Sequence, residues 1–313
     1  MSHESDTPRD LAPSTLRLAG IQIRDPFVLT VAETGTYYLF GSTDKDIWRG
    51  PAEGFDCYRS ADLEQWVGPI PAFRPPAGFW SDRNYWAPEV HAYDGRFFMF
   101  ATFTAEGVRR GTQILVSDAP SGPYVPWGDG PVTPREWECL DGTLHVDEAG
   151  DPWIVFCHEW AQVWDGEIVA QRLSPDLSRA IGEPLVLFRA SEAPWVERLR
   201  HPRVPEDVAA YVTDGPFLHR LASGGLIMLW SSFGGSGYAM GIARSASGRV
   251  QGPWVQEDAP IWARDGGHGM IARTLDGGLL LTLHQPNETP LERAVLLELE
   301  ETAETVRPSP RVA

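Results

Sequence analysis

The stretch DPFVLTVAETGTYYLFGST, residues 25–43, is the first of five related segments that decide the fold. Further copies begin at Trp86, Asp141, Asp214 and Gly267. Each predicts a strand, a turn built on Gly or Asp, and a second, more apolar strand. Because such a unit cannot bury its apolar face alone, copies about 40 to 50 residues or more apart predict a propeller or solenoid. We therefore expect an all-β fold, a five-bladed β-propeller.

The endings of the copies strengthen this prediction. After a third strand, four copies continue into a similar short polar turn, as in ILVSDAPSGPYVPW and GIARSASGRVQGPW. We expect blades near residues 21–70, 84–128, 138–189, 210–256 and 266–302, with ends uncertain by roughly 2 to 4 residues. Residues 1–20 are rich in Ser, Pro and Asp and predict an N-terminal arm, followed by a single catalytic domain over 21–313.

Composition excludes several classes of partner. The net charge of −17 argues against nucleic acid and anionic membranes, which both require a basic face. No apolar stretch approaches the length of a membrane span, and the N-terminal sequence lacks a secretory signal pattern, so we expect a cytoplasmic protein. The three cysteines show no CxxC spacing and predict reduced, mostly buried thiols. A neutral small-molecule substrate remains compatible with this charge.

Propeller geometry brings distant residues together. The innermost strands line a central channel, so the residues that begin them should meet at one mouth. These residues, which we place at equivalent positions of the repeat, are Asp25, Trp86, Asp141, Asp214 and His268. Three carboxylates, an aromatic ring and an imidazole suit a site that cleaves carbohydrate, because glycoside hydrolysis requires two carboxyl groups in opposite protonation states.

Each of these residues also has a purely structural interpretation. An Asp before Pro or Gly is usually a turn former, and a Trp in a sheet protein is usually core. The histidine between two glycines would alone indicate a turn or a buried, satisfied side chain. It is the recurrence of acids at the same place in several copies that favours a functional site.

At these residues the sequence resembles glycoside hydrolase family 43, the five-bladed propellers that act mainly on arabinofuranosides and xylosides. The motifs that carry the resemblance are RDPF at 24–27, YWAPEV at 85–90, Asp141 in the third blade and GHG at 267–269. The resemblance implies that Asp25 is the general base and that Asp141 tunes the pKa of the general acid. It also places a bound ion, such as calcium, or a water on the propeller axis near His268, with no cofactor required.

One motif departs from the family pattern. The family's general acid is a Glu followed by Gly-Pro, whereas this chain has Asp214 before Gly215-Pro216. The shorter side chain would place the carboxyl about 1.5 Å further back. Glu159 is the alternative acid, because the second strand of the third blade should return to the same mouth. This residue could instead bind a sugar hydroxyl or form a structural ion pair.

These residues together predict hydrolysis of a terminal sugar of an oligosaccharide with inversion. We expect Asp25 to activate water and Asp214, or Glu159, to protonate the glycosidic oxygen. Trp86 and Trp160 should shape the sugar subsite, while Arg24 and His268 should hold hydroxyls or a carboxylate. The resemblance implies an α-L-arabinofuranoside as substrate, ahead of a β-D-galactofuranoside or a β-D-xyloside.

Two other functions stay open from the sequence. A glycoside phosphorylase on a similar scaffold would need cations to hold phosphate, for which Arg24, Arg83 and His268 are candidates. A non-catalytic sugar-binding propeller is suggested by the Asp in place of Glu at residue 214.

Overall fold

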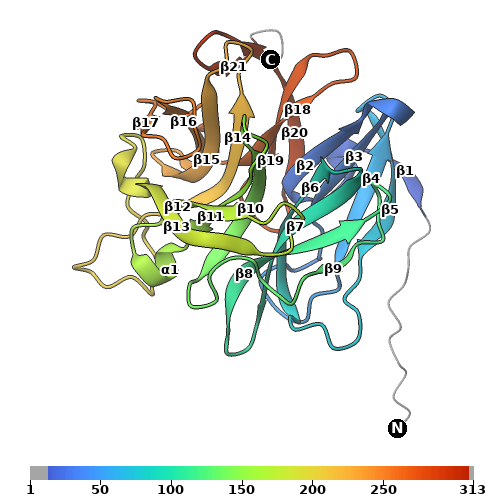
Figure 1. Ribbon diagram of the computed structural model, residues 1–313, viewed down its shortest axis with the longest axis horizontal. Coiled ribbons are helices and arrows are strands. Elements are labelled where there is room, and N and C mark those ends of the chain that lie inside the picture. The colour runs from blue at the N-terminus through green and yellow to red at the C-terminus, as the bar shows by residue number, and fades with distance from the viewer. Residues whose placement is uncertain (1–12, 310–313) are drawn as a thin grey trace.

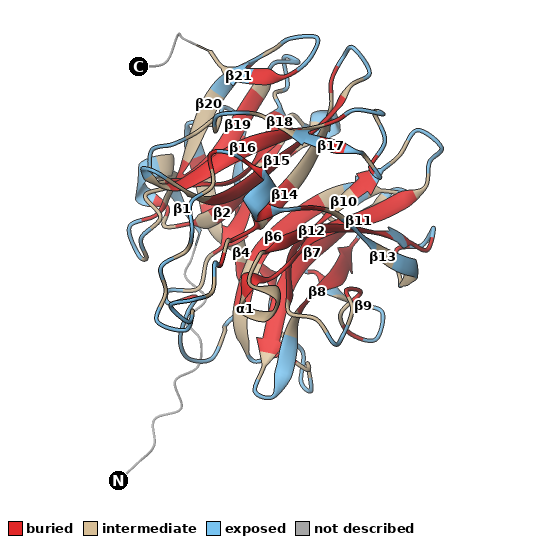
Figure 2. Cartoon of the chain, turned by 90° about the vertical axis from the view of Figure 1, so that its left-hand side faces the viewer, coloured by how far each residue is buried: buried red, intermediate tan, exposed pale blue. Residues whose placement is uncertain are grey.

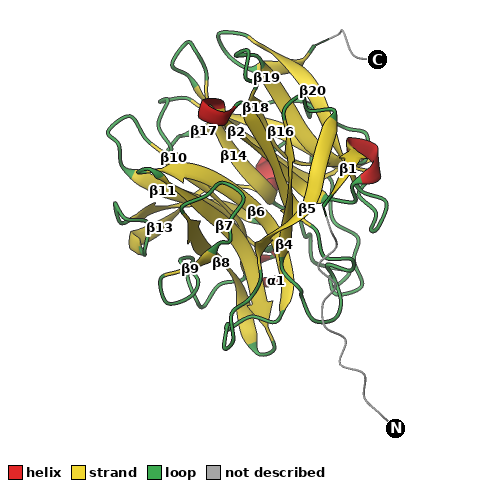
Figure 3. Cartoon of the chain, turned by 90° about the vertical axis from the view of Figure 1, so that its right-hand side faces the viewer, coloured by secondary structure: helices red, strands yellow, loops and turns green. Residues whose placement is uncertain are grey.

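The computed structural model, which describes residues 13–309, confirms an all-β five-bladed propeller. Five antiparallel sheets stand around a central axis, with the chain running from one blade to the next (Figure 1). Strands make up nearly all the regular structure, and helix is confined to short turns (Figure 3). In the part of the chain that the structure describes, no helix is long and apolar enough to cross a membrane.

The first two blades precede residue 130. Blade 1 contains β2 (Arg24–Val31), β3 (Thr36–Ser42), β4 (Phe55–Ser60) and β5 (Gln65–Phe73), with β1 (Ser14–Arg17) on its outer edge. Blade 2 contains β6 (Arg83–Tyr93), β7 (Arg96–Ala105), β8 (Val108–Ser117) and β9 (Val125–Trp127). In both blades the strands follow one another outward from the axis in chain order, except that β1, at the outer edge of blade 1, precedes β2.

The other three blades repeat this order. Blade 3 contains β10 (Cys139–Val146), β11 (Pro152–His158), β12 (Glu167–Leu173) and β13 (Ala180–Arg189). Blade 4 contains β14 (Asp214–Arg220), β15 (Leu226–Gly234), β16 (Gly237–Ser245) and β17 (Trp254–Gln256). Blade 5 contains β18 (Gly267–Arg273), β19 (Leu279–Gln285), β20 (Arg293–Glu301) and β21 (Val306–Pro308). The short helices are η1 (Leu18–Gly20), η2 (Ala32–Thr34), α1 (Trp160–Val163) and η3 (Ala190–Glu192).

Local sequence explains both the hairpins and the core. Asp94 and Gly95 join β6 to β7 as a two-residue turn with positive φ at both residues, 46° and 74°, which is the turn that Asp-Gly favours. The middle strands are apolar on both faces because they pack between neighbouring blades, and Figure 2 shows them buried. Trp66 and Trp230 are fully buried in these layers, as expected for most of the aromatic residues. Cys57, Cys139 and Cys157 are free, buried thiols.

The chain ends differ in detail from the prediction. Within the predicted arm over 1–20, Ser14–Arg17 forms β1 and pairs antiparallel with β5; residues 1–12 lie outside the described part of the chain. The fifth blade continues past residue 302 to β21. A β-bridge between Gln22 and Arg293 connects the first and last blades, as does a hydrogen bond from Thr282 to the carbonyl of Pro26. The ring therefore closes by side-by-side contact of blades 1 and 5.

Candidate active site

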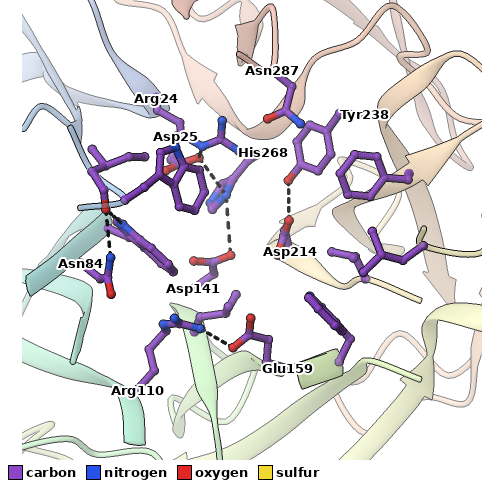
Figure 4. A pocket seen from close by; sticks show the side chains of 18 of the residues that line it. Arg24, Asp25, Asn84, Arg110, Asp141, Glu159, Asp214, Tyr238, His268 and Asn287 are labelled. Atoms are coloured by element: carbon purple, nitrogen blue, oxygen red, sulfur yellow. Dashed lines mark hydrogen bonds and ion pairs between the residues drawn. The ribbon is translucent and has the colours of Figure 1, made fainter. Parts of the chain in front are cut away.

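A pocket of about 510 Å³ opens at the axial mouth of the propeller. It contains every side chain that the sequence predicted for the site: Arg24, Asp25, Trp86, Asp141, Glu159, Trp160, Asp214 and His268. In Figure 4 the carboxylates of Asp25, Asp141, Asp214 and Glu159 surround one open space, although they come from three different blades. The predicted convergence of distant residues is thus observed.

The innermost strand of every blade carries a β-bulge at this mouth. In blade 1 the strand register shifts between Arg24 and Phe27, and it shifts at the matching place in the other blades, after Trp86, Leu140, Asp214 and Gly267. The first bulged residue always has positive φ: Asp25 (53°), Ala87 (45°), Asp141 (56°), Gly215 (52°) and His268 (45°). For a residue other than Gly this conformation costs on the order of 1–3 kcal/mol, and such strain clusters at functional sites.

This register corrects the predicted equivalence of the five residues. Asp25, Asp141 and His268 do occupy one position, but Trp86 and Asp214 lie one residue earlier, at the position of Arg24. The bulged residue of blade 4 is Gly215 because a Cβ there would lie 2.5 Å from the ring of His268. In blades 2 and 4, the residue predicted from the repeat therefore lies one position before the bulged residue.

Asp25 is surrounded by groups that favour its charged form. Its Oδ1 lies 3.2 Å from His268 Nδ1 and 3.6 Å from Arg24 Nε, while Ser42 Oγ donates a hydrogen bond of 2.8 Å to Oδ2. Burial raises the pKa of Asp25, but the neighbouring His268 and Arg24 more than offset this and leave the pKa below its ordinary value. Asp25 is therefore ionised at neutral pH.

Asp141 and Asp214 are shifted in the opposite direction. Burial raises the pKa of Asp141 well above its ordinary value, and the charge of Asp25 raises it further. Burial, followed by the charge of Asp141, raises the pKa of Asp214 to about 7. The Asp214 carboxylate accepts a hydrogen bond of 2.9 Å from the hydroxyl of Tyr238. Both carboxyls therefore take up a proton at higher pH than Asp25 does.

Glu159 lies in the pocket at the first residue after β11, as its predicted return to the mouth requires. Its carboxylate accepts a hydrogen bond from Arg110 in an ion pair in which both side chains are largely buried. Burial raises the pKa of Glu159, and the Arg110 charge opposes this rise. Glu159 thus differs from Asp214, which has no guanidinium in direct contact among the described residues.

The pocket aromatics are stacked against cations. The Arg110 guanidinium lies 4.3 Å from the ring centroid of Trp86, and Trp48 packs edge-on against the same indole at 5.1 Å. Trp160 is only 8% exposed, with the Arg203 guanidinium 5.0 Å from its ring centroid. Trp48, at 48% exposed, presents the more accessible indole. The rings that were predicted to shape a sugar subsite therefore line the pocket with much of their surface already covered.

Arg24 and His268 are both occupied by carboxylates. Arg24 lies 3.3 Å from Glu292 as well as near Asp25, and His268 Nδ1 lies 3.6 Å from Asp141 Oδ2 as well as near Asp25. Within residues 13–309 no group of three or more His, Cys, Asp or Glu side chains is arranged to hold a metal ion. The ion or water that the resemblance places near His268 stays a prediction.

Several pocket residues were not predicted from the sequence. They are Trp48, Asn84, Arg110, His201, Arg203, Tyr238, Asn287 and Thr289. Most lie in loops or on third strands, where the repeat provides no fixed position. Tyr238 lies at the start of the third strand of blade 4, close to the mouth, but in the sequence a Tyr in a strand cannot be distinguished from a core residue.

Comparison with known proteins identifies the family. A family model described as glycosyl hydrolases family 43 matches residues 20–303, and the chain therefore belongs to this family. The chain is 25% identical to the extracellular exo-α-(1→5)-L-arabinofuranosidase ArbA of Cellvibrio japonicus, over 84% of this chain and 79% of that protein. It is 43% identical to a crystal structure described as the endo-arabinase from Bacteroides thetaiotaomicron, with a TM-score of 0.84 and coverage of 92% of this chain and 97% of that one.

A shorter match has consequences for location. The extracellular endo-α-(1→5)-L-arabinanase 1 of Bacillus subtilis is 23% identical over 45% of each chain. Because this relative and the Cellvibrio enzyme are both named extracellular, the predicted cytoplasmic location is contradicted. Family membership makes the chain an inverting glycoside hydrolase that acts on an oligosaccharide, and it does not favour a phosphorylase or a non-catalytic sugar-binding propeller.

Proposed function

We propose that this family 43 hydrolase releases terminal α-L-arabinofuranosyl units from oligosaccharides. In this proposal Asp25 is the general base, Asp214 is the general acid and Asp141 sets the pKa and orientation of the acid. The observation that carries it is the opposite shift of two carboxyl pKa values around one pocket, lowered at Asp25 and raised to about 7 at Asp214. β-D-Galactofuranosides and β-D-xylosides are the next candidates.

The steps follow from the protonation states. Ionised Asp25 accepts a proton from a water that attacks the anomeric carbon, while protonated Asp214 donates its proton to the departing glycosidic oxygen. Asp25 thus gains a proton as Asp214 loses one, and exchange with solvent restores both. Asp141 Oδ2 accepts a hydrogen bond of 3.1 Å from the backbone N–H of Gly215, which connects it to the residue next to the acid.

The proposed sugar rests on the named activities of relatives, which include an exo-acting arabinofuranosidase and an endo-acting arabinanase. The test is a time course on α-1,5-linked arabino-oligosaccharides and a panel of 4-nitrophenyl furanosides and pyranosides, followed by NMR. We expect arabinose as the first product, released as the β anomer and at the same rate with or without phosphate. Initial release of the α anomer would contradict inversion, and initial release of dimers or trimers would contradict terminal action.

The same carboxyls predict a bell-shaped pH dependence of kcat/KM. Activity falls at alkaline pH when Asp214 loses its proton, so the alkaline limb should lie near pH 7, since burial and Asp141 raise the pKa of Asp214 to about 7. Activity falls at acid pH when Asp25 gains a proton, and this limb should lie below the ordinary carboxyl range because the pKa of Asp25 is lowered. If the alkaline limb of the profile persists in Asp214→Asn, that limb reports the titration of another group.

A further inference from the structure

Hydrogen bonds between blades hold the backbone of every bulged residue at the pocket mouth. In four of the five blades, a side chain near the end of the second strand accepts a hydrogen bond from the bulged N–H of the next blade. The pairs are Ala87 N–H to Ser42 Oγ (2.9 Å), Asp141 N–H to Thr102 Oγ1 (2.9 Å), His268 N–H to Ser231 Oγ (2.8 Å) and Asp25 N–H to His284 Nδ1 (3.2 Å). We call Ser42, Thr102, Ser231 and His284 the bracing residues.

The bracing residues occupy one register position. Each pairs with the residue just before the bulge of its own blade, the partners being Arg24, Trp86, Asp214 and Gly267. All four are buried, with at most 3% exposed. A bulge leaves a backbone N–H without a partner in its own sheet, and a buried, unpaired donor is costly. The side chains therefore remove that cost at the residues whose φ is positive.

Blade 3 is the exception, and it connects two carboxyls. Its residue at this register position is Cys157, opposite Leu140. A thiol is a weak acceptor, and the N–H of Gly215 is bound instead by Asp141 Oδ2 at 3.1 Å. The backbone N–H of Asp141 is thus held by Thr102 of blade 2. The side chain of Asp141 in turn holds the backbone N–H of Gly215 in blade 4, next to Asp214.

His284 must be neutral to accept from Asp25 N–H. Its Nδ1 faces that N–H, and its Nε2 lies 3.3 Å from Asn287 Oδ1, so the Nε2 tautomer satisfies both contacts. Burial and the charge of Arg24 lower the pKa of His284 to about 3, in agreement with a neutral ring. The ring of Tyr238 stacks on the ring of His284, with the two centroids 5.7 Å apart.

We propose that Ser42, Thr102, Ser231 and His284 are positioning residues for glycoside hydrolysis, an inference that rests on the roles proposed above for Asp25 and Asp141. Each holds one residue of the mouth in the left-handed conformation, and three of the residues held, Asp25, Asp141 and His268, line the pocket. Thr102 has the greatest consequence, because it holds Asp141, which in turn holds the backbone beside Asp214.

The test uses Thr102→Val, which removes the hydroxyl and keeps the shape of the side chain. We expect kcat to fall by about 10-fold to 100-fold with KM within twofold, because small displacements at a reacting centre have effects of this size. Displacement of Asp141 also removes charge beside Asp214, so the alkaline limb of the pH profile should move to lower pH. Thr102→Ser, which keeps the hydroxyl, should restore both.

The matched control is Thr143→Val. Thr143 is a buried threonine of β10 whose hydroxyl has no partner among the described residues, so its loss should leave kcat and the pH profile unchanged. Hydrogen exchange at the Asp141 amide supplies a readout that needs no substrate, and it should be faster in Thr102→Val. It separates failure of this inference from failure of the proposed function.

Wild-type kcat, pH profile and amide protection in Thr102→Val would overturn the proposal, as would a Thr102→Ser variant that behaves like Thr102→Val. If Thr102→Val does not fold, Ser231→Ala tests the same idea at His268, with Ser231→Thr as the conservative variant. Equal kcat values for Ser231→Ala and Ser231→Thr would also overturn the proposal.

Discussion

Asp25→Asn is expected to lower kcat by about 10³-fold to 10⁴-fold while KM changes little, since loss of a general base has effects at the upper end of acid–base catalysis. The amide preserves the size of the side chain and can still accept from Ser42, whose hydroxyl lies 2.8 Å away. It cannot accept a proton from water. Steady-state kinetics on the best substrate of the panel provides the measurement, with thermal melting to verify the fold.

Two companion variants make this result specific. Asp82→Asn alters an exposed carboxylate paired with Arg83, away from the pocket lining, and should retain wild-type kcat. Asp25→Gly leaves space beside the Arg24 guanidinium and the His268 ring, so added azide should replace water and yield a β-configured glycosyl azide from an α-linked substrate with a good leaving group. If Asp25→Asn keeps more than a few per cent of wild-type activity, the base is another residue.

The repeat made the fold and much of the site predictable. Apolar second strands and Asp-Gly or Gly-rich turns recur with the spacing of blades, and propeller topology alone brings their first residues to one mouth. Prediction failed at single-residue precision. Asp141 and Asp214 both precede Gly in the sequence, yet one is the bulged residue and the other lies before the bulge. Where a bulge falls depends on pairing with the next strand, which a turn motif does not specify.

Contacts between blades were beyond the sequence for another reason. Arg110 lies on a third strand and reaches both Trp86 and Glu159, which belong to different blades. Trp160 was expected to shape the sugar subsite, and in the structure His201 and Arg203, from one loop, pack against its ring. Neither Arg110 on its third strand nor the residues of an irregular loop have a fixed position in the repeat, so neither set of contacts leaves a periodic signal. Polar residues near the ends of apolar second strands, Ser42, Thr102 and Ser231, did leave a periodic signal, and it becomes interpretable only when the strand register is known.

The second large effect is expected from removal of the general acid, for which Asp214 and Glu159 are the two candidates. A general acid must hold a proton near neutral pH and release it to the leaving oxygen. Glu159 is paired with Arg110, whose guanidinium stays charged and stabilises the carboxylate. Among the described residues, the Tyr238 hydroxyl is the side-chain hydrogen-bond partner of the Asp214 carboxylate, and burial together with the charge of Asp141 raises the pKa of Asp214 to about 7.

Asp214→Asn should therefore lower kcat/KM on an arabino-oligosaccharide by about 10³-fold, because a sugar alkoxide leaves poorly without a proton. With a 2,4-dinitrophenyl glycoside, whose leaving group needs no proton, the loss should shrink to about 10-fold or less. The alkaline limb near pH 7 should vanish for both substrates. Glu159→Gln should instead lower kcat/KM by a similar factor on both substrates and keep the alkaline limb. This variant breaks the ion pair with Arg110 but leaves the general acid in place. The reverse pattern, with leaving-group dependence in Glu159→Gln alone, would assign the proton to Glu159 and leave Asp214 as a carboxyl that orients the substrate.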